Sequence, residues 1–154
     1  MSRLSICLLS ASLALGACAT DLPTSLPSPS ATPTLEGTSW RLAGFRSGDD
    51  GAGALQPRAA DQFTLSFGKE GRLTAKLDCN RGTGPWQAVA GDAQGGTLSL
   101  GPVATTRMMC PPDPLGTRLA ADLTALRTYR MQDARLYTSL PADAGVYIWE
   151  PVTP

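Results

Sequence analysis

Two neighbouring segments in the middle of the chain alternate polar and apolar residues, and this pattern requires a sheet with one buried face. Residues 62–67 alternate strictly, which places two phenylalanines and a leucine on the same side of an extended chain. Residues 72–77 repeat the alternation after a Gly-Lys-Glu-Gly sequence. Two such runs joined by a short turn that contains glycine predict an antiparallel hairpin with one apolar face.

The rest of the region from residue 35 onwards adds further strands and one helix. Asp113 and Pro114 suit the first positions of a helix, and leucines follow at helical spacing as far as Leu126. Residues 46–60 have no periodicity and contain several glycines, so we expect a loop there. Strand patterns cover residues 38–45, 97–100, 128–131, 135–140 and 145–150. The order predicts an α+β domain in which one helix packs on a curved antiparallel sheet.

The N-terminal residues predict export and a membrane anchor. Residues 1–17 begin with a positive charge and continue with about 12 apolar or small residues, which span roughly 18 Å as a helix. That length is too short for a bilayer core of roughly 30 Å but suits a signal peptide. The sequence Leu-Gly-Ala-Cys at residues 15–18 resembles the lipobox of bacterial lipoproteins, so we expect lipid on Cys18. The alternative is an ordinary secretory signal cleaved near Ala17 or Ala19, with an incidental cysteine.

Residues 18–34 join this anchor to the domain that we expect at residues 35–154. Their Ser, Thr and Pro content favours an extended, semi-rigid tether over a packed structure. In Gram-negative bacteria an aspartate after the lipidated cysteine favours retention in the inner membrane, and this chain has Ala19 at that position. We therefore expect the cell envelope as the location, with the protein held on the outer membrane and facing the periplasm.

Cys79 and Cys110 are the two cysteines that remain after Cys7 leaves with the signal peptide and Cys18 takes the lipid. An even pair in an oxidising compartment predicts a disulfide. The alternatives are two free thiols or a redox-active couple. Redox activity usually requires closely spaced cysteines such as Cys-x-x-Cys, which this chain lacks.

Composition removes several classes of function. The chain contains no histidine, which excludes Ser-His-Asp and Cys-His catalysis, histidine zinc sites and a histidine general base. The 13 Lys and Arg residues balance the 13 Asp and Glu residues and form no basic stripe, so nucleic acid is not an expected partner. We identify no catalytic residue, no metal site and no cofactor site, and we expect a protein that is not an enzyme.

One polar patch could bind a ligand. Residues 78–86 are expected to form a turn pinned by the disulfide. The bond would bring Asn80 and Arg81 close to Arg107 and Met108, and two guanidiniums beside an amide could hold a carboxylate or a phosphate. The alternative is that Asn80 caps a turn, the arginines are solvated and Met108 fills the core.

Five short motifs follow one another along the expected domain. They are GTSWRL at residues 37–42, FGKEGRL at 67–73, CNR at 79–81, TRMMC at 106–110, and the helix through Leu126 with Tyr129 and then Leu136. Their order resembles the META domain, the HslJ-like group of bacterial envelope proteins. The resemblance covers nearly all of residues 35–150 and implies an α+β fold with a partly barrel-like sheet. It implies no catalytic residues, and it links the chain to stress response, antibiotic tolerance and secretion.

The chain departs from the META pattern in two places. Asp78 stands where the family usually has glycine, which puts the geometry of that turn in doubt. The acidic residue that is common early in the helix is also missing.

These observations favour a non-enzymatic, membrane-tethered envelope lipoprotein that binds an unidentified protein or a cell-wall component. The alternative is an inhibitor of an envelope hydrolase such as a protease or lysozyme. An inhibitor requires a rigid exposed loop, and residues 84–96 are the expected candidate.

Overall fold

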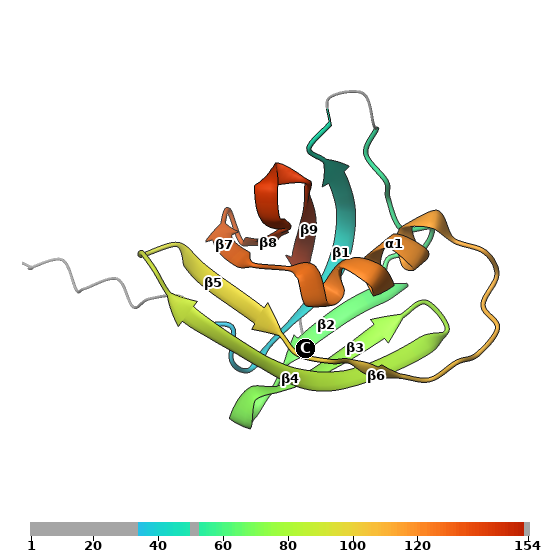
Figure 1. Cartoon of the computed structure of the whole chain (residues 1–154), viewed down its shortest axis with the longest axis horizontal. Helices are drawn as coiled ribbons and strands as arrows, with labels where there is room; N and C mark the ends of the chain where they lie inside the picture. The colour runs from blue at the N-terminus through green and yellow to red at the C-terminus, as the bar shows by residue number, and fades with distance from the viewer. Residues whose placement is uncertain (1–33, 50–52, 153–154) are drawn as a thin grey trace, which may run out of the picture.

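The structure is a computed structural model that describes residues 34–49 and 53–152 of the chain (Figure 1). The expected signal peptide, Cys18 and the tether up to residue 33 lie outside the described residues. The strands are β1 Thr38–Ser47, β2 Phe63–Phe67, β3 Arg72–Leu77, β4 Asn80–Ala90, β5 Gly95–Leu100, β6 Ala104–Thr105, β7 Thr128–Gln132, β8 Arg135–Ser139 and β9 Gly145–Pro151. The helix α1 covers Pro114–Asp122, and short 3-10 turns cover Lys69–Gly71, Leu123–Ala125 and Pro141–Asp143.

Eight of these strands form a closed antiparallel barrel. The order around the barrel is β3-β2-β1-β9-β8-β7-β5-β4, and β4 pairs with β3 to complete the ring. The short β6 lies outside the ring and pairs with the first part of β4. An antiparallel sheet with one helix is confirmed, and its closure is more complete than the expected partly barrel-like sheet.

The hairpin expected at residues 62–77 is confirmed in its register. Phe63 pairs with Leu77 and Phe67 with Leu73, so the apolar residues of both strands point into the barrel. An eight-stranded barrel has an interior that side chains can fill. The buried residues that fill this one include Trp40, Leu42, Phe45, Phe63, Leu65, Phe67, Leu73, Leu98, Tyr129, Leu136, Tyr147 and Trp149.

The first strand contains a bulge, and it is two residues longer than expected because Arg46 and Ser47 also pair with β9. Its pairing with β9 shifts between Leu42 and Gly44. The extra residue changes the alternation, and Phe45 is buried directly after Gly44. In the expected 46–60 loop, Leu55 pairs with Phe45 through two backbone hydrogen bonds.

The turn expected at residues 78–86 is wrong, because β4 begins at Asn80 and only Asp78 and Cys79 form the turn. The alternation at the start of β4 is hidden in the sequence because two of its inward positions, Gly82 and Gly84, are glycines. A Cβ atom at Gly82 would lie 2.8 Å from the Val103 side chain, and one at Gly84 would lie 2.7 Å from a backbone oxygen. The segment that leads into β6 therefore packs directly on the backbone of β4.

The helix packs on the end of the barrel at which β1 and β3 finish (Figure 1). The expected apolar face is confirmed, since Leu115, Leu119, Leu123 and Leu126 are all buried. The helix itself ends at Asp122, whose carboxylate accepts a hydrogen bond of 2.7 Å from the buried Tyr147 hydroxyl. Burial and the neighbouring carboxylate raise the pKa of this tyrosine. Within the described residues no helix is long and apolar enough to cross a membrane.

Candidate functional site

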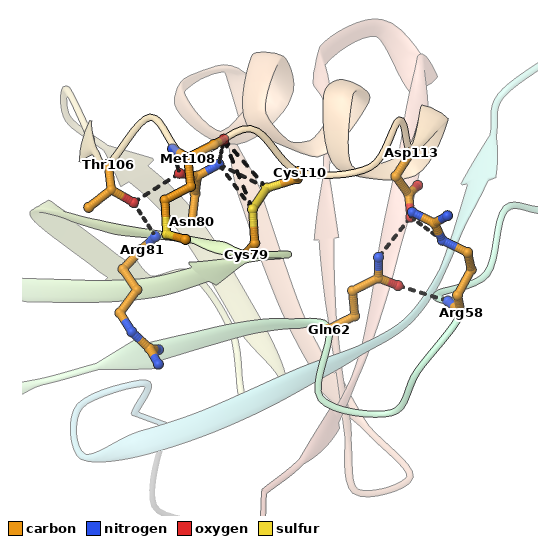
Figure 2. Close-up of a disulfide and its surroundings, with 9 residues drawn as sticks. All are labelled: Arg58, Gln62, Cys79, Asn80, Arg81, Thr106, Met108, Cys110 and Asp113. Carbon is orange, nitrogen blue, oxygen red and sulfur yellow. Dashed lines mark hydrogen bonds and ion pairs between the residues drawn. A yellow bond between two sulfur atoms is a disulfide. The ribbon is translucent and has the colours of Figure 1, made fainter.

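A disulfide joins Cys79, in the turn between β3 and β4, to Cys110, which precedes the helix (Figure 2). The two Cα atoms are 5.7 Å apart, within the usual range for a disulfide. The bond holds the segment Thr106–Cys110, called here the 106–110 loop, against the β3–β4 turn. The expected pairing of these cysteines is thus present in the structure.

The side chain of Asn80 fixes the backbone of this loop (Figure 2). Its Oδ1 accepts hydrogen bonds from the Met108 N–H at 2.7 Å and from the Thr106 hydroxyl at 2.9 Å. Its Nδ2 donates to the Met108 carbonyl at 3.2 Å and lies 3.1 Å from the Cys110 sulfur. One amide therefore satisfies both backbone groups of Met108, as a neighbouring strand would.

Two further sets of hydrogen bonds fix the ends of the loop. The Thr106 N–H donates to the Arg81 carbonyl at 2.9 Å, and the Arg81 N–H donates to the Thr106 hydroxyl at 3.0 Å. At the other end the Cys110 N–H donates to the Met108 carbonyl at 3.1 Å, which closes a tight turn around Met109. The loop is therefore held by Asn80 and Arg81 at Thr106 and Met108, by its own turn at Cys110, and by a covalent bond.

The side chains of the loop project into solvent. Met108 is 64% exposed and Met109 is 99% exposed, and Arg107 is also exposed. The alternative in which Met108 fills the core is therefore wrong, while Asn80 does fix a turn. Met109 was not among the expected site residues, because an exposed and a buried methionine look alike in a sequence.

The expected group of four residues is only partly brought together. Asn80, Arg107 and Met108 lie on or beside the loop, but Arg81 reaches it through its backbone alone. Figure 2 shows the Arg81 guanidinium directed away from the loop. Among residues 34–49 and 53–152, neither the Arg81 nor the Arg107 guanidinium has an ion pair or a hydrogen bond.

A hollow of about 260 Å³ lies between this loop and α1. Its walls include Asn80, Cys110, Asp113 and Gly116. Neither Arg81 nor Arg107 lines it, so the hollow does not present the two guanidiniums that an anion site would use. In the part of the chain that the structure describes, no three Cys, Asp or Glu side chains lie close enough to hold a metal ion.

Asp113 anchors the start of the helix on the far side of this hollow. Its Oδ1 accepts from the N–H groups of Leu115 and Gly116, as expected for an N-cap. Its Oδ2 accepts from Gln62 at 2.8 Å and from Arg58 at 3.0 Å (Figure 2). Burial alone would raise the pKa of this carboxyl, but these hydrogen bonds and the Arg58 charge outweigh it and lower the pKa. The charged carboxylate therefore fixes both the helix and the chain before β2.

The β3–β4 turn that carries Cys79 has a strained residue. Leu77 pairs with Asn80, so Asp78 and Cys79 are the whole turn, and Asp78 has a φ of 60°. Glycine adopts this conformation without the steric cost that a Cβ atom imposes. The doubt about this turn is thus resolved: Asp78 adopts the backbone conformation that the usual glycine favours.

Replacing Asp78 with glycine is expected to raise the free energy of unfolding by about 0.5–1 kcal/mol, because relief of strain exceeds the added entropy of the unfolded chain. Urea denaturation of the two proteins measures the difference. The matched control is Thr74→Gly on the exposed face of β3, where φ is not positive; it should lower stability by about as much. If Asp78→Gly also lowers the free energy of unfolding, the backbone at Asp78 is not strained.

Two solved structures are similar to this chain in fold. The solution structure of a protein from Burkholderia xenovorans matches with a TM-score of 0.59 and 24% identity, over 88% of this chain and 98% of that chain. The crystal structure of a DUF4847 family protein from Bacteroides vulgatus matches with a TM-score of 0.53 and 14% identity, over 74% of this chain and 92% of that chain. At these identities the likeness concerns the fold alone.

A comparison with curated proteins gives no match. The sequence model of the META domain matches residues 33–147, which span β1 to β8 with α1 and the first part of β9. The match includes the disulfide, Asn80 and the whole 106–110 loop. Because it extends over well more than half of the 154 residues, the chain belongs to the META domain family.

Proposed function

We propose that the protein is a membrane-tethered lipoprotein of the bacterial cell envelope whose META domain binds a partner there without catalysing a reaction. The observation that carries the binding role is the 106–110 loop, which the disulfide and Asn80 fix while its side chains stay exposed. A surface that is already ordered loses little conformational freedom on binding. Methionine and arginine are also enriched in protein interfaces. The partner is a protein or a cell-wall component, in keeping with a role in the envelope stress response.

The tether is supported by the sequence before the barrel. The cysteine of the Leu-Gly-Ala-Cys motif at residues 15–18 directly follows an apolar segment of signal-peptide length. A disulfide between Cys79 and Cys110 suits the oxidising compartment to which such a signal leads. With Ala19 after the lipidated cysteine, the outer membrane facing the periplasm is the proposed location.

Replacing Cys18 with serine is expected to move the protein from the membrane fraction to a soluble or unprocessed form, because the lipid is the anchor. Intact mass of the membrane-fraction protein should show acyl chains on the wild type and none on the variant. Cys7→Ser is the matched control, since that cysteine lies within the signal segment, and it should leave acylation and location unchanged. A wild-type protein without acyl chains, or a C18S protein that is cleaved and still fractionates with the membrane, would refute the tether.

A second candidate is an inhibitor of an envelope hydrolase. The loop expected for it at residues 84–96 is wrong, since β4 and β5 occupy most of that range and form a hairpin. The stapled 106–110 loop supplies a rigid, exposed segment instead. Inhibition of a purified envelope protease or lysozyme by the oxidised domain, lost on reduction, would favour this candidate over binding to a non-enzymatic partner.

A further inference from the structure

The 106–110 loop lies at the end of the barrel opposite the start of β1. Thr38 pairs with Phe67, beside the beginning of β3. The loop is attached to Asn80, which pairs with Leu77 at the other end of β3. The first described residues, which lead into β1, therefore lie at one end of the barrel, and the loop lies at the other end.

The backbone of the loop is not available to a partner at its central residue. Asn80 occupies both the N–H and the carbonyl of Met108, and the Cys110 N–H donates to the same carbonyl. Recognition by strand addition requires free backbone donors and acceptors in an extended segment. The tight turn around Met109 does not offer such a segment, so recognition at this loop has to use its side chains.

Three side chains are available, and their chemistry is mixed. Met109 stands at the tip and is almost completely exposed, and Met108 is about two-thirds exposed beside it. Arg107 is exposed, and its guanidinium has no carboxylate partner among the described residues. A flexible thioether fits irregular apolar pockets, and an arginine pairs well with a carboxylate.

We propose that the 106–110 loop is a preformed knob that inserts Met109 into an apolar pocket of a folded envelope protein. Arg107 pairs with a carboxylate on the rim of that pocket, and Asn80 and the disulfide hold the knob in position. This rests on the proposed function for the compartment in which the partner is found. The position of the loop, at the end of the barrel opposite the first described residues, favours a protein over the membrane that holds the lipid.

A photo-crosslinking residue at position 109 of the full-length protein, illuminated in intact cells, tests the knob. The expected result is one dominant protein adduct, whose crosslinked peptide is apolar and has an Asp or Glu close by. Val89 is the matched control position, because it is 68% exposed and apolar but lies on the β4–β5 hairpin. The same crosslinker at position 89 should not give that adduct.

Charge reversal separates specific binding from mere exposure. Arg107→Glu should lower the yield of the position-109 adduct at least about tenfold, the effect of losing one good interfacial ion pair. Arg81→Glu is the matched control, because that guanidinium is equally unpaired but points away from the loop (Figure 2), and it should leave the yield unchanged. Both variants are at exposed positions, and thermal melting should show wild-type stability.

Four outcomes of the crosslinking experiment would contradict the proposed knob: no dominant adduct at position 109, the same adduct from position 89, an adduct that Arg107→Glu does not reduce, or a crosslink to lipid. Binding of the purified domain to vesicles of phosphatidylethanolamine and phosphatidylglycerol that is lost in Met109→Ser would overturn it in favour of a membrane surface. The proposed function fails separately, through a protein that carries no lipid on Cys18. An acylated protein that gives no adduct at position 109 would contradict the proposed binding by Met109, but it would agree with the proposed lipid tether.

Discussion

Replacing both Cys79 and Cys110 with serine lowers the free energy of unfolding by about 3–4 kcal/mol, as expected from the chain-entropy model for a bond of this span. The two cysteines are 31 positions apart, and the covalent link restricts the whole segment from β4 to the start of the helix in the unfolded chain. The hydrogen bonds from Asn80 to Met108 remain possible in the variant. The measured loss therefore reports the covalent link more than the loss of the loop's polar contacts.

Urea denaturation of the oxidised wild type and the double variant measures this effect, and reductant supplies the control. Dithiothreitol should lower the wild type to the stability of the variant and leave the variant unchanged. A wild type that is indifferent to reductant would contradict a disulfide. Equal stability of the two oxidised proteins would contradict its contribution to the fold.

Replacing Gly95 with alanine destabilises the barrel by about 3 kcal/mol or more, at the upper end of what overpacking costs. A Cβ atom at this position would lie 2.2 Å from the Tyr129 carbonyl oxygen and 2.9 Å from the Arg130 Cα. Both are backbone atoms of β7, so no side-chain rotation relieves the overlap. The clash falls between β5 and β7, which are joined in the barrel by only three residue pairs.

Gly91→Ala is the matched control in the same hairpin. The nearest atom to a Cβ there is 3.5 Å away, which is ordinary van der Waals contact, and φ at this glycine is not positive. We expect a change within about 0.5 kcal/mol, as for most surface substitutions. Thermal unfolding, followed by near-ultraviolet circular dichroism, measures the change in stability of both variants. If G95A melts like the wild type, β5 and β7 do not approach each other as closely as described.

Local pattern predicted most strands and the helix because their signals lie within a few residues of one another. Strict alternation marked β2 and β3, and Asp113 with Pro114 marked the first turn of α1. The start of β4 was missed because two of its inward positions, Gly82 and Gly84, carry no apolar side chain. Complete closure was missed because the pairing of β1 with β9 joins distant segments and leaves no local signal.

The candidate site could also be predicted only in part from the sequence. Counting cysteines was enough to pair Cys79 with Cys110, and the turn between β3 and β4 drew attention to Asn80. The direction of Arg81 could not be predicted, because it follows from the alternation of a strand that the sequence did not reveal. Nothing in the sequence distinguishes Met109, whose exposure results from the tight turn that Asn80 and Cys110 enforce.

The pairing of the first and last strands of the barrel has a consequence for the order of folding. The strands β1 and β9 form seven residue pairs, and the paired residues lie about 100 positions apart in the chain. All the other strands of the barrel come earlier in the chain than β9. Because the chain is made from its N-terminus, β1 is available first and keeps one edge unpaired until β9 follows. Such long-range closure is slow, and the waiting edge is a template for association with other chains. Hairpins such as β2–β3 and β7–β8 are able to form meanwhile, so the pairing of β1 with β9 is the step that removes the unpaired edge from a newly made chain.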